Sequence, residues 1–257
     1  MRHSFVTLWL LPLVLPLVLV CSPGPTEPTG LGELGDGMKV LFIGNSLTAF
    51  NDLPRMVQIV GESAGLEIAC RSVTVGNYSL EDHWKAGEGL EAIRSADWDV
   101  VVLQQGPSSL ALNKIHLREW TRTFDAAIRE QGARTALYMV WPEATRQAAF
   151  DAVSDSYTQA ADAVGGMLFP VGEAWRAAWD RDPDLDLYWS DGFHPSELGS
   201  ALGALVIFQQ IFHVSPVGLP AVMTPTTQGL PSLSIPAELA PLLQEAAAQA
   251  NAEFGRR

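Results

Sequence analysis

The stretch at residues 38–48, MKVLFIGNSLT, carries the clearest structural signal in the chain. Its first six residues form a short apolar run, which is typical of a strand buried on both faces of a sheet. The turn residues GNS at 44–46 interrupt this run. Asp52 and Pro54 then mark a helix start, because proline is favoured in the first helical turn. The stretch therefore predicts a strand, a tight turn and a helix.

The same alternation continues toward the C-terminus. Further strands are predicted at 66–75, 99–104, 134–141 and 167–171, and helices at 80–93, 116–130, 146–164 and 196–212. Strands that alternate with helices pair in parallel through right-handed crossovers. We therefore expect an α/β fold, with three layers and a central parallel sheet, over residues 38–214. Within residues 215–257, the sequence predicts a proline-rich segment followed by a C-terminal helix, and we expect this part to pack back on the domain.

The first 21 residues have the pattern of an export signal. Arg2 and His3 precede an uncharged apolar run at 5–20, which is short for a membrane span. Cys21 follows this run as in a lipoprotein signal, although Val20 stands where a small residue is usual. A cleaved signal, a lipid on Cys21 and an uncleaved anchor all stay open. Each places the domain outside the cytoplasmic membrane, in the periplasm or the extracellular space, beyond a flexible linker at 22–37.

The composition indicates a folded, acidic protein. The 257 residues are 47% hydrophobic and 18% charged, and their formal net charge is −13. This charge argues against nucleic-acid binding, which needs basic groups that neutralise phosphates. It also argues against docking on an anionic membrane by charge alone. The two cysteines, Cys21 and Cys70, are too few for a disulfide framework or a zinc site.

Polar clusters follow three of the predicted strands, and a fourth precedes the last predicted helix. They lie at 44–48, 76–77, 104–108 and 191–196. Ligands of open parallel sheets bind at the carboxyl ends of the strands. Ser46 can be held exposed between a strand and a helix, and Asp191 can orient His194 so that its Nε2 accepts a proton. Each signal alone also fits an ordinary turn, cap or surface residue, so the indication of a hydrolytic site lies in their combination.

In this order the clusters resemble the SGNH (GDSL-like) hydrolase superfamily, over about residues 39–213. GNSLT at 44–48 is similar to the nucleophile block of that superfamily, with Asn45 where aspartate is usual. Gly76 is similar to the glycine of the second block. DGFHP at 191–195 is similar to the terminal block, which carries the acid and the base.

The third block departs from the superfamily pattern. The family usually has Gly-x-Asn-Asp, whereas VLQQGPS stands at 102–108. Gln105 is the expected replacement for the asparagine, because a Gln-Gly variant occurs in some acetylesterase-like branches. Ser108 takes that place in another alignment, and Gln104 is a third alternative. The amide that completes the oxyanion hole is therefore left open.

The resemblance implies a flavodoxin-like fold and a serine esterase that forms an acyl-enzyme. Ser46 would be the nucleophile, His194 the general base and Asp191 the carboxylate that orients it. The amides of Ser46 and Gly76 and the side chain of Gln105 would form the oxyanion hole. The mechanism calls for no metal and no organic cofactor.

Further substrate contacts are expected from side chains beside these blocks: Asn45, Asn77, Gln104, Ser108 and Trp189. Trp189 lies two residues before the acid, and an aromatic ring suits stacking on a sugar. The expected partner is a small-molecule or carbohydrate ester, with carbohydrate O-acetyl groups favoured. No nucleic-acid partner is expected, and membrane contact only through the N-terminal signal or a lipid. A lipase or thioesterase stays open, as does a non-catalytic, surface-tethered glycan-binding or scaffold protein.

Overall fold

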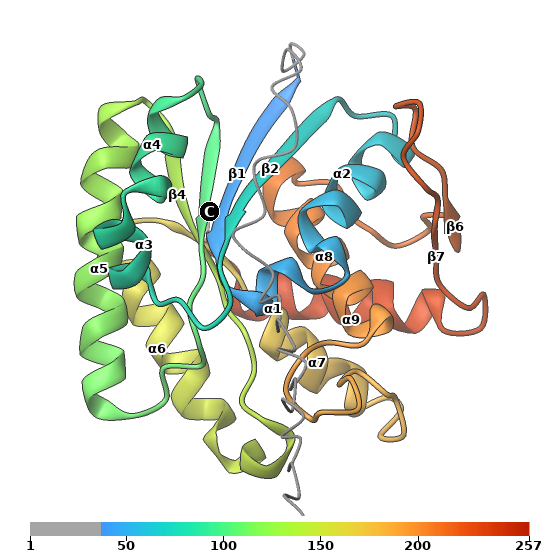
Figure 1. The fold of residues 1–257 in the computed structure, drawn as a ribbon. Helices are drawn as coiled ribbons and strands as arrows, with labels where there is room; N and C mark the ends of the chain where they lie inside the picture. The colour runs from blue at the N-terminus through green and yellow to red at the C-terminus, as the bar shows by residue number, and fades with distance from the viewer. Residues whose placement is uncertain (1–36, 257) are drawn as a thin grey trace, which may run out of the picture.

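A computed structural model describes residues 37–256 of the chain. Its centre is a five-stranded parallel sheet in the order β2-β1-β3-β4-β5 (Figure 1). The strands are β1 (Met38–Gly44), β2 (Ile68–Thr74), β3 (Val100–Leu103), β4 (Arg134–Tyr138) and β5 (Met167–Phe169). This order is that of flavodoxin-like folds, whose ligands bind where the strand order reverses, beside the first and third strands. The predicted α/β fold with a parallel sheet is confirmed.

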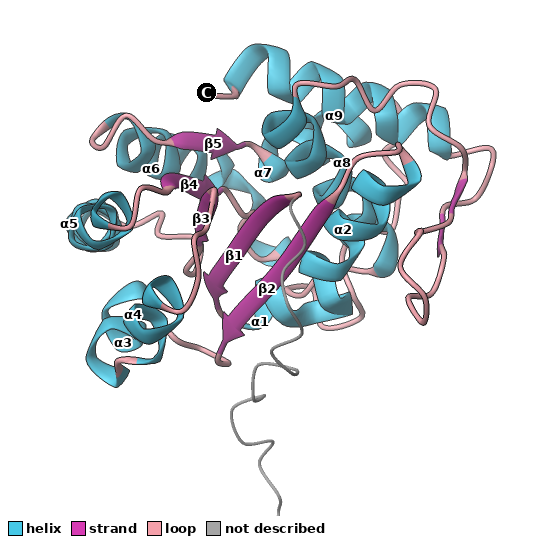
Figure 2. Ribbon diagram, turned by 90° about the horizontal axis from the view of Figure 1, so that it is seen from above, coloured by secondary structure: helices cyan, strands magenta, loops and turns pink. Residues whose placement is uncertain are grey.

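Helices cover both faces of the sheet (Figure 2). One layer contains α3 (Leu80–Ala86), α4 (Glu88–Arg94), α5 (Ala111–Glu130) and α6 (Phe150–Asp162). The other contains α2 (Leu53–Ser63), α7 (Val171–Trp179), α8 (Glu197–Phe212) and α9 (Ala240–Phe254). Short elements complete the described chain: α1 (Ser46–Ala49), the 3₁₀ turns η1 (Phe50–Asp52) and η2 (Ala144–Ala149), and a small hairpin of β6 (Val222–Met223) and β7 (Leu233–Ser234).

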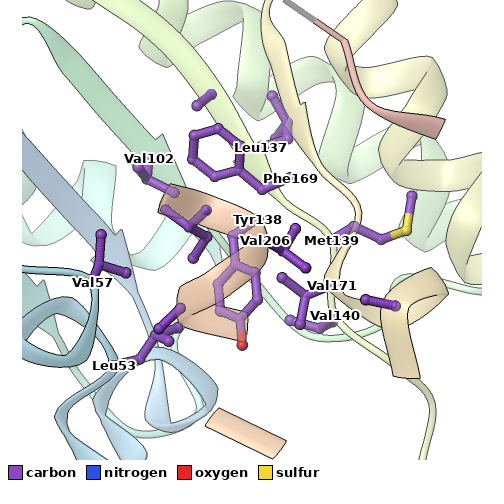
Figure 3. Close-up of a cluster of buried hydrophobic side chains, with 14 of the residues drawn as sticks. Leu53, Val57, Val102, Leu137, Tyr138, Met139, Val140, Phe169, Val171 and Val206 are labelled. Carbon is purple, nitrogen blue, oxygen red and sulfur yellow. The ribbon is translucent and has the colours of Figure 1, made fainter. Parts of the chain in front are cut away.

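Burial of the central strands on both faces explains their apolar sequences. All four residues of β3 are fully buried, as are the apolar residues that end β1. Figure 3 shows one cluster of this core, in which Leu53 and Val57 of α2 and Val206 of α8 accompany the strand residues Val102 and Leu137. Helix α8 is buried along nearly its whole length, because α2, α7 and α9 all pack against it.

The structure differs from the sequence-based expectations at several helices. The single helix expected at 80–93 is divided into α3 and α4 at Gly87, whose φ of 87° is left-handed and so interrupts the helix. The helix expected from 146 begins at Phe150, after the turn η2. Helix α7 was not expected, and residue 171, placed in a strand by the sequence, is its first residue.

The C-terminal segment packs on the rest of the domain. Helix α9 contacts α7 and α8, and Asn251 Nδ2 donates to the carbonyl oxygen of Val206 at 3.1 Å. The amide of Leu168 in β5 donates to the carbonyl oxygen of Arg256 at 3.0 Å, so the end of the chain lies against the edge strand.

The predicted export signal, Cys21 and nearly all of the predicted linker lie outside the described residues. Within residues 37–256, no helix combines the length and the apolar character that a membrane span requires.

Candidate active site

Ser46, His194 and Asp191 form one hydrogen-bonded chain at the carboxyl end of the sheet. His194 Nε2 lies 2.9 Å from Ser46 Oγ, and His194 Nδ1 lies 2.6 Å from Asp191 Oδ2. Ser46 begins α1, directly beyond the end of β1 (Figure 1). The other two residues lie in the loop that precedes α8. The fold thus joins groups that are 148 residues apart along the chain.

The turn that carries Ser46 is held by side-chain amides. Asn45 Oδ1 accepts from the amide of Leu47 at 3.1 Å and caps α1. Gln104, at the end of β3, accepts from the Asn45 amide at 2.9 Å and from Thr48 Oγ1 at 2.7 Å. Its Nε2 donates to Asn45 Oδ1 at 3.0 Å and to the Gln105 carbonyl oxygen at 2.6 Å. The turn after β1 is therefore fastened to the end of β3.

Three polar residues that the sequence places near the substrate are hydrogen-bonded within the protein. Gln104 is 1% exposed, and both of its N–H groups and both acceptor positions of its oxygen are used by protein groups. Asn45 is likewise buried and also donates to the Tyr78 carbonyl oxygen. Ser108 Oγ donates to the Gly106 carbonyl oxygen and accepts from Gln105. Asn45, Gln104 and Ser108 thus hold the loops around Ser46, and their expected contacts with a substrate stay predictions.

His83 also hydrogen-bonds to the turn after β1. Its Nε2 lies 2.7 Å from the carbonyl oxygen of Gly44, and the imidazole is fully buried. Burial lowers the pKa of His83, so the ring is neutral near pH 7 and its Nε2–H donates to that carbonyl.

The loop that carries His194 is closed by its own hydrogen bonds. Asp191 Oδ1 accepts from the amides of Phe193 and His194, both at 2.9 Å. The amide of Trp189 donates to the His194 carbonyl oxygen at 2.8 Å. Trp141 Nε1 donates to the Phe193 carbonyl oxygen at 3.0 Å, which fastens the loop to the segment after β4. The loop is therefore held both internally and against the sheet.

Asp191 is suited to orient His194. The hydrogen bond from His194, together with those from two backbone amides, holds the pKa of Asp191 below its usual value, so the carboxylate is ionised at neutral pH. An ionised carboxylate at Nδ1 keeps the proton there and leaves Nε2 free to accept one from Ser46. The side chains of His194 and Asp191 are 21% and 44% exposed, so solvent reaches the site.

The expected oxyanion donors differ in how the fold presents them. Gly76 follows β2 and is exposed, one residue after Val75, whose amide donates to the Gly44 carbonyl oxygen at 3.2 Å. Gly76 therefore lies beside the turn of Ser46. Gln105 Nε2 donates to Ser108 Oγ at 2.9 Å, which uses one of its two N–H groups, and its Oε1 accepts from the amide of Leu80. The second N–H has no partner among the described residues.

Two neighbours of Ser46 also contact the loop of His194. The Phe50 ring stacks on the His194 imidazole, with centroids 4.5 Å apart and planes at 18°. Asn51 Nδ2 donates to the Pro195 carbonyl oxygen at 3.1 Å and to Ser200 Oγ at 2.9 Å. Sequence reasoning missed both residues, because no local spacing relates them to a loop about 144 residues away.

The remaining expected contacts, Asn77 and Trp189, are both exposed. Their contacts with a substrate therefore stay predictions. Within residues 37–256, no three His, Cys, Asp or Glu side chains are grouped so that they could hold a metal ion.

Comparison with known proteins supports the fold. No protein-family model and no curated protein matches the chain. A DUF4886 family protein from Bacteroides uniformis is 21% identical, with a TM-score of 0.69 over 85% of this chain and 96% of that one. A candidate SGNH hydrolase from Slackia heliotrinireducens is 26% identical, with a TM-score of 0.59 over 68% and 98%. A lipase/acylhydrolase from Enterococcus faecalis is 19% identical, with a TM-score of 0.54 over 68% and 95%. These likenesses and the sheet order confirm the resemblance: the chain has the α/β fold of the SGNH hydrolases.

Proposed function

We propose that the chain is a serine esterase that hydrolyses small acyl esters. The observation that carries this proposal is the hydrogen-bonded chain from Asp191 through His194 to Ser46. A carboxylate, an imidazole and a hydroxyl in this order are the groups that acyl transfer to serine requires. The partial exposure of the site supports direct access for a soluble ester.

In the proposed mechanism, Ser46 Oγ attacks the ester carbonyl carbon while its proton passes to His194 Nε2. The resulting oxyanion accepts hydrogen bonds from the amides of Ser46 and Gly76 and from the second N–H of Gln105. Collapse of this intermediate breaks the bond to the alcohol, which leaves with the proton from His194. Water then attacks the acyl-enzyme, again giving its proton to His194, and the acid is released as Ser46 regains its proton.

The proposal extends to the substrate and the place of action. Acetylated carbohydrates are the favoured substrates, since Trp189 offers an exposed ring close to the site. The chain acts in the periplasm or the extracellular space after export by its N-terminal signal. It contacts a membrane only through that signal or through a lipid on Cys21, and it binds no nucleic acid.

The direct test compares hydrolysis of p-nitrophenyl acetate by the wild-type protein and by Ser46→Ala. Loss of the nucleophile should lower kcat by about 10³-fold or more. A fluorophosphonate probe should label Ser46 in the wild type, as mass spectrometry of the labelled peptide would show. Equal rates for both proteins would contradict the proposal. A folded wild type that turns over no ester and takes no label would favour the non-catalytic glycan-binding alternative.

A further inference from the structure

Trp189 is an unusual surface residue. Its side chain is 53% exposed, and among the large apolar side chains exposed in residues 37–256 it is the one aromatic. Tryptophan is ordinarily well buried, because its ring is the largest apolar side-chain surface in proteins. The other exposed apolar side chains lie on different segments, at the start of α5 and after α8. Burial in the protein core therefore does not explain the position of Trp189.

The rings of Trp189, Phe50 and His194 are contiguous. The Phe50 ring stacks on the His194 imidazole, and the Trp189 ring lies 6.4 Å from Phe50 at an angle of 57°. The backbone holds Trp189 in place, since its amide donates to the His194 carbonyl oxygen and its own carbonyl accepts from Gly192 at 2.9 Å. An aromatic surface thus extends from the His194 imidazole through Phe50 of η1 to the exposed ring of Trp189.

The direction of proton transfer decides which half of an ester meets these rings. His194 Nε2 must return its proton to the departing alcohol oxygen, so the alcohol lies on the imidazole side of Ser46. In the proposed mechanism, the carbonyl oxygen points instead to the expected oxyanion donors, among them the amide of Gly76 after β2. The Phe50 ring stacks on the imidazole and the Trp189 ring lies next to Phe50, so both rings are on the side of the alcohol.

The chemistry of the surface indicates a ring-shaped, polar alcohol. An exposed aromatic face binds the apolar face of a pyranose while the hydroxyl groups at the ring edge stay in water. Ser190 and Asp191, which follow Trp189, are also exposed and polar. A short alkyl alcohol such as ethanol would gain less there, because it has less apolar surface to bury against the rings.

We infer that Phe50 and Trp189 form the subsite for the alcohol part of the ester, and that this alcohol is a pyranose of an acetylated carbohydrate. The inference rests on the proposed esterase function and deepens it. It assigns the two rings to the leaving group, so that they discriminate between alcohols and not between acyl groups.

The test uses two series of esters with the purified protein. One series joins acetate to different alcohols, namely ethanol and a methyl pyranoside; the other joins different acyl groups to the pyranoside. Trp189→Ala should lower kcat/KM on the acetylated pyranoside about tenfold more than on ethyl acetate, mainly through KM, which is the size expected for one aromatic contact. Its loss should be the same for acetyl, propionyl and butyryl pyranosides. Trp189→Phe should restore most of the loss.

Two further variants sharpen the result. Phe50→Leu should show the same preference between alcohols, added to a loss common to all esters because Phe50 also packs on His194. Leu112→Ala, which removes a side chain that is 78% exposed on α5, is the matched control and should change neither series. An equal loss for both alcohols in Trp189→Ala, or a loss that grows with acyl length, would overturn the inference.

A binding measurement separates this inference from the esterase proposal. Calorimetry with Ser46→Ala and the acetylated methyl pyranoside measures binding without turnover. Trp189→Ala in that background should weaken binding about tenfold. Lack of esterase activity in the wild type with this Trp189-dependent binding would contradict only the esterase proposal. Turnover of the pyranoside ester with no Trp189 dependence in either assay would contradict only the subsite.

Discussion

At the level of single residues, two glycines near Ser46 differ in whether the fold itself requires glycine at their position. A Cβ at Gly44 would lie 2.4 Å from Thr48 Oγ1 and 2.5 Å from Gln104 Oε1, so the protein itself needs glycine there. A Cβ at Gly76 would meet nothing within 4 Å, and the φ of Gly76 is not left-handed. The fold therefore tolerates a side chain at Gly76, and a need for glycine there would come from a bound ester.

The variant Gly76→Ala tests this difference. Its thermal unfolding should match that of the wild type, because the added methyl group has room. Its kcat/KM for p-nitrophenyl acetate should fall by about tenfold or more, because the methyl group restricts the approach of the oxyanion to the Gly76 amide. Gly44→Ala is the contrasting variant and should lose stability. A fully active Gly76→Ala would mean that the oxyanion is bound elsewhere.

At the level of elements, the junction between α1 and α2 has a strained backbone and contacts the loop of His194. Asn51 and Asp52 are successive residues with left-handed φ values of 55° and 53°. This conformation is unfavourable for residues with a Cβ, although Asn and Asp adopt it most readily. The hydrogen bonds of Asn51 to Pro195 and Ser200 hold the junction, and they tie the segment after Ser46 to the loop of His194 and to α8.

Substitutions at Asn51 separate the backbone strain from the side-chain contacts. Both Asn51→Gly and Asn51→Ala lose the two hydrogen bonds, so both should lower kcat by about tenfold or more as His194 loosens against Ser46, with less change in KM. Asn51→Ala should be less stable than Asn51→Gly by about 1 kcal/mol in urea unfolding, because only alanine resists the left-handed conformation. Unchanged kcat in both variants would show that Asn51 does not position His194.

At the level of the whole molecule, a buried carboxylate ties the late proline-rich segment to α2. Glu62 is 6% exposed, and it accepts from the amides of Thr226 and Thr227 at 2.9 and 2.8 Å. Its Oε1 also accepts from Gln58 Nε2 at 2.7 Å. Burial alone would raise the pKa of Glu62, but these hydrogen bonds outweigh it and hold the pKa below the ordinary value.

The lowered pKa predicts how stability depends on pH. The pKa of Glu62 is lower in the folded than in the unfolded protein, so its contribution to stability is complete above the unfolded value and is lost as pH falls through the folded value. Wild type should therefore exceed Glu62→Gln in the free energy of unfolding by more at pH 7 than at about pH 3. Urea titrations at both pH values measure this. Glu67→Gln, at an exposed carboxylate, is the control; the same difference at both pH values would contradict the prediction.

Local patterns in the sequence were sufficient for the architecture. Apolar runs mark β1, β3 and β4, because strands buried on both faces need continuous apolar residues. Helix α7 was missed because its nine residues follow β5 with a single intervening proline, so the apolar run of the strand continues into the helix. Periodicity cannot locate an element boundary inside such a run.

The sequence by itself determined the α/β class, the succession of the five sheet strands along the chain, and the short segments that contain Ser46, Asp191 and His194. Only the tertiary structure decided which side-chain amides are fully hydrogen-bonded within the protein, as at Gln104, and which keep one N–H without a partner among the described residues, as at Gln105. It alone also placed Phe50 on His194. The physical reason is that strand and helix patterns are set by neighbours along the chain, whereas hydrogen-bond partners and ring contacts are set by segments that only folding brings together.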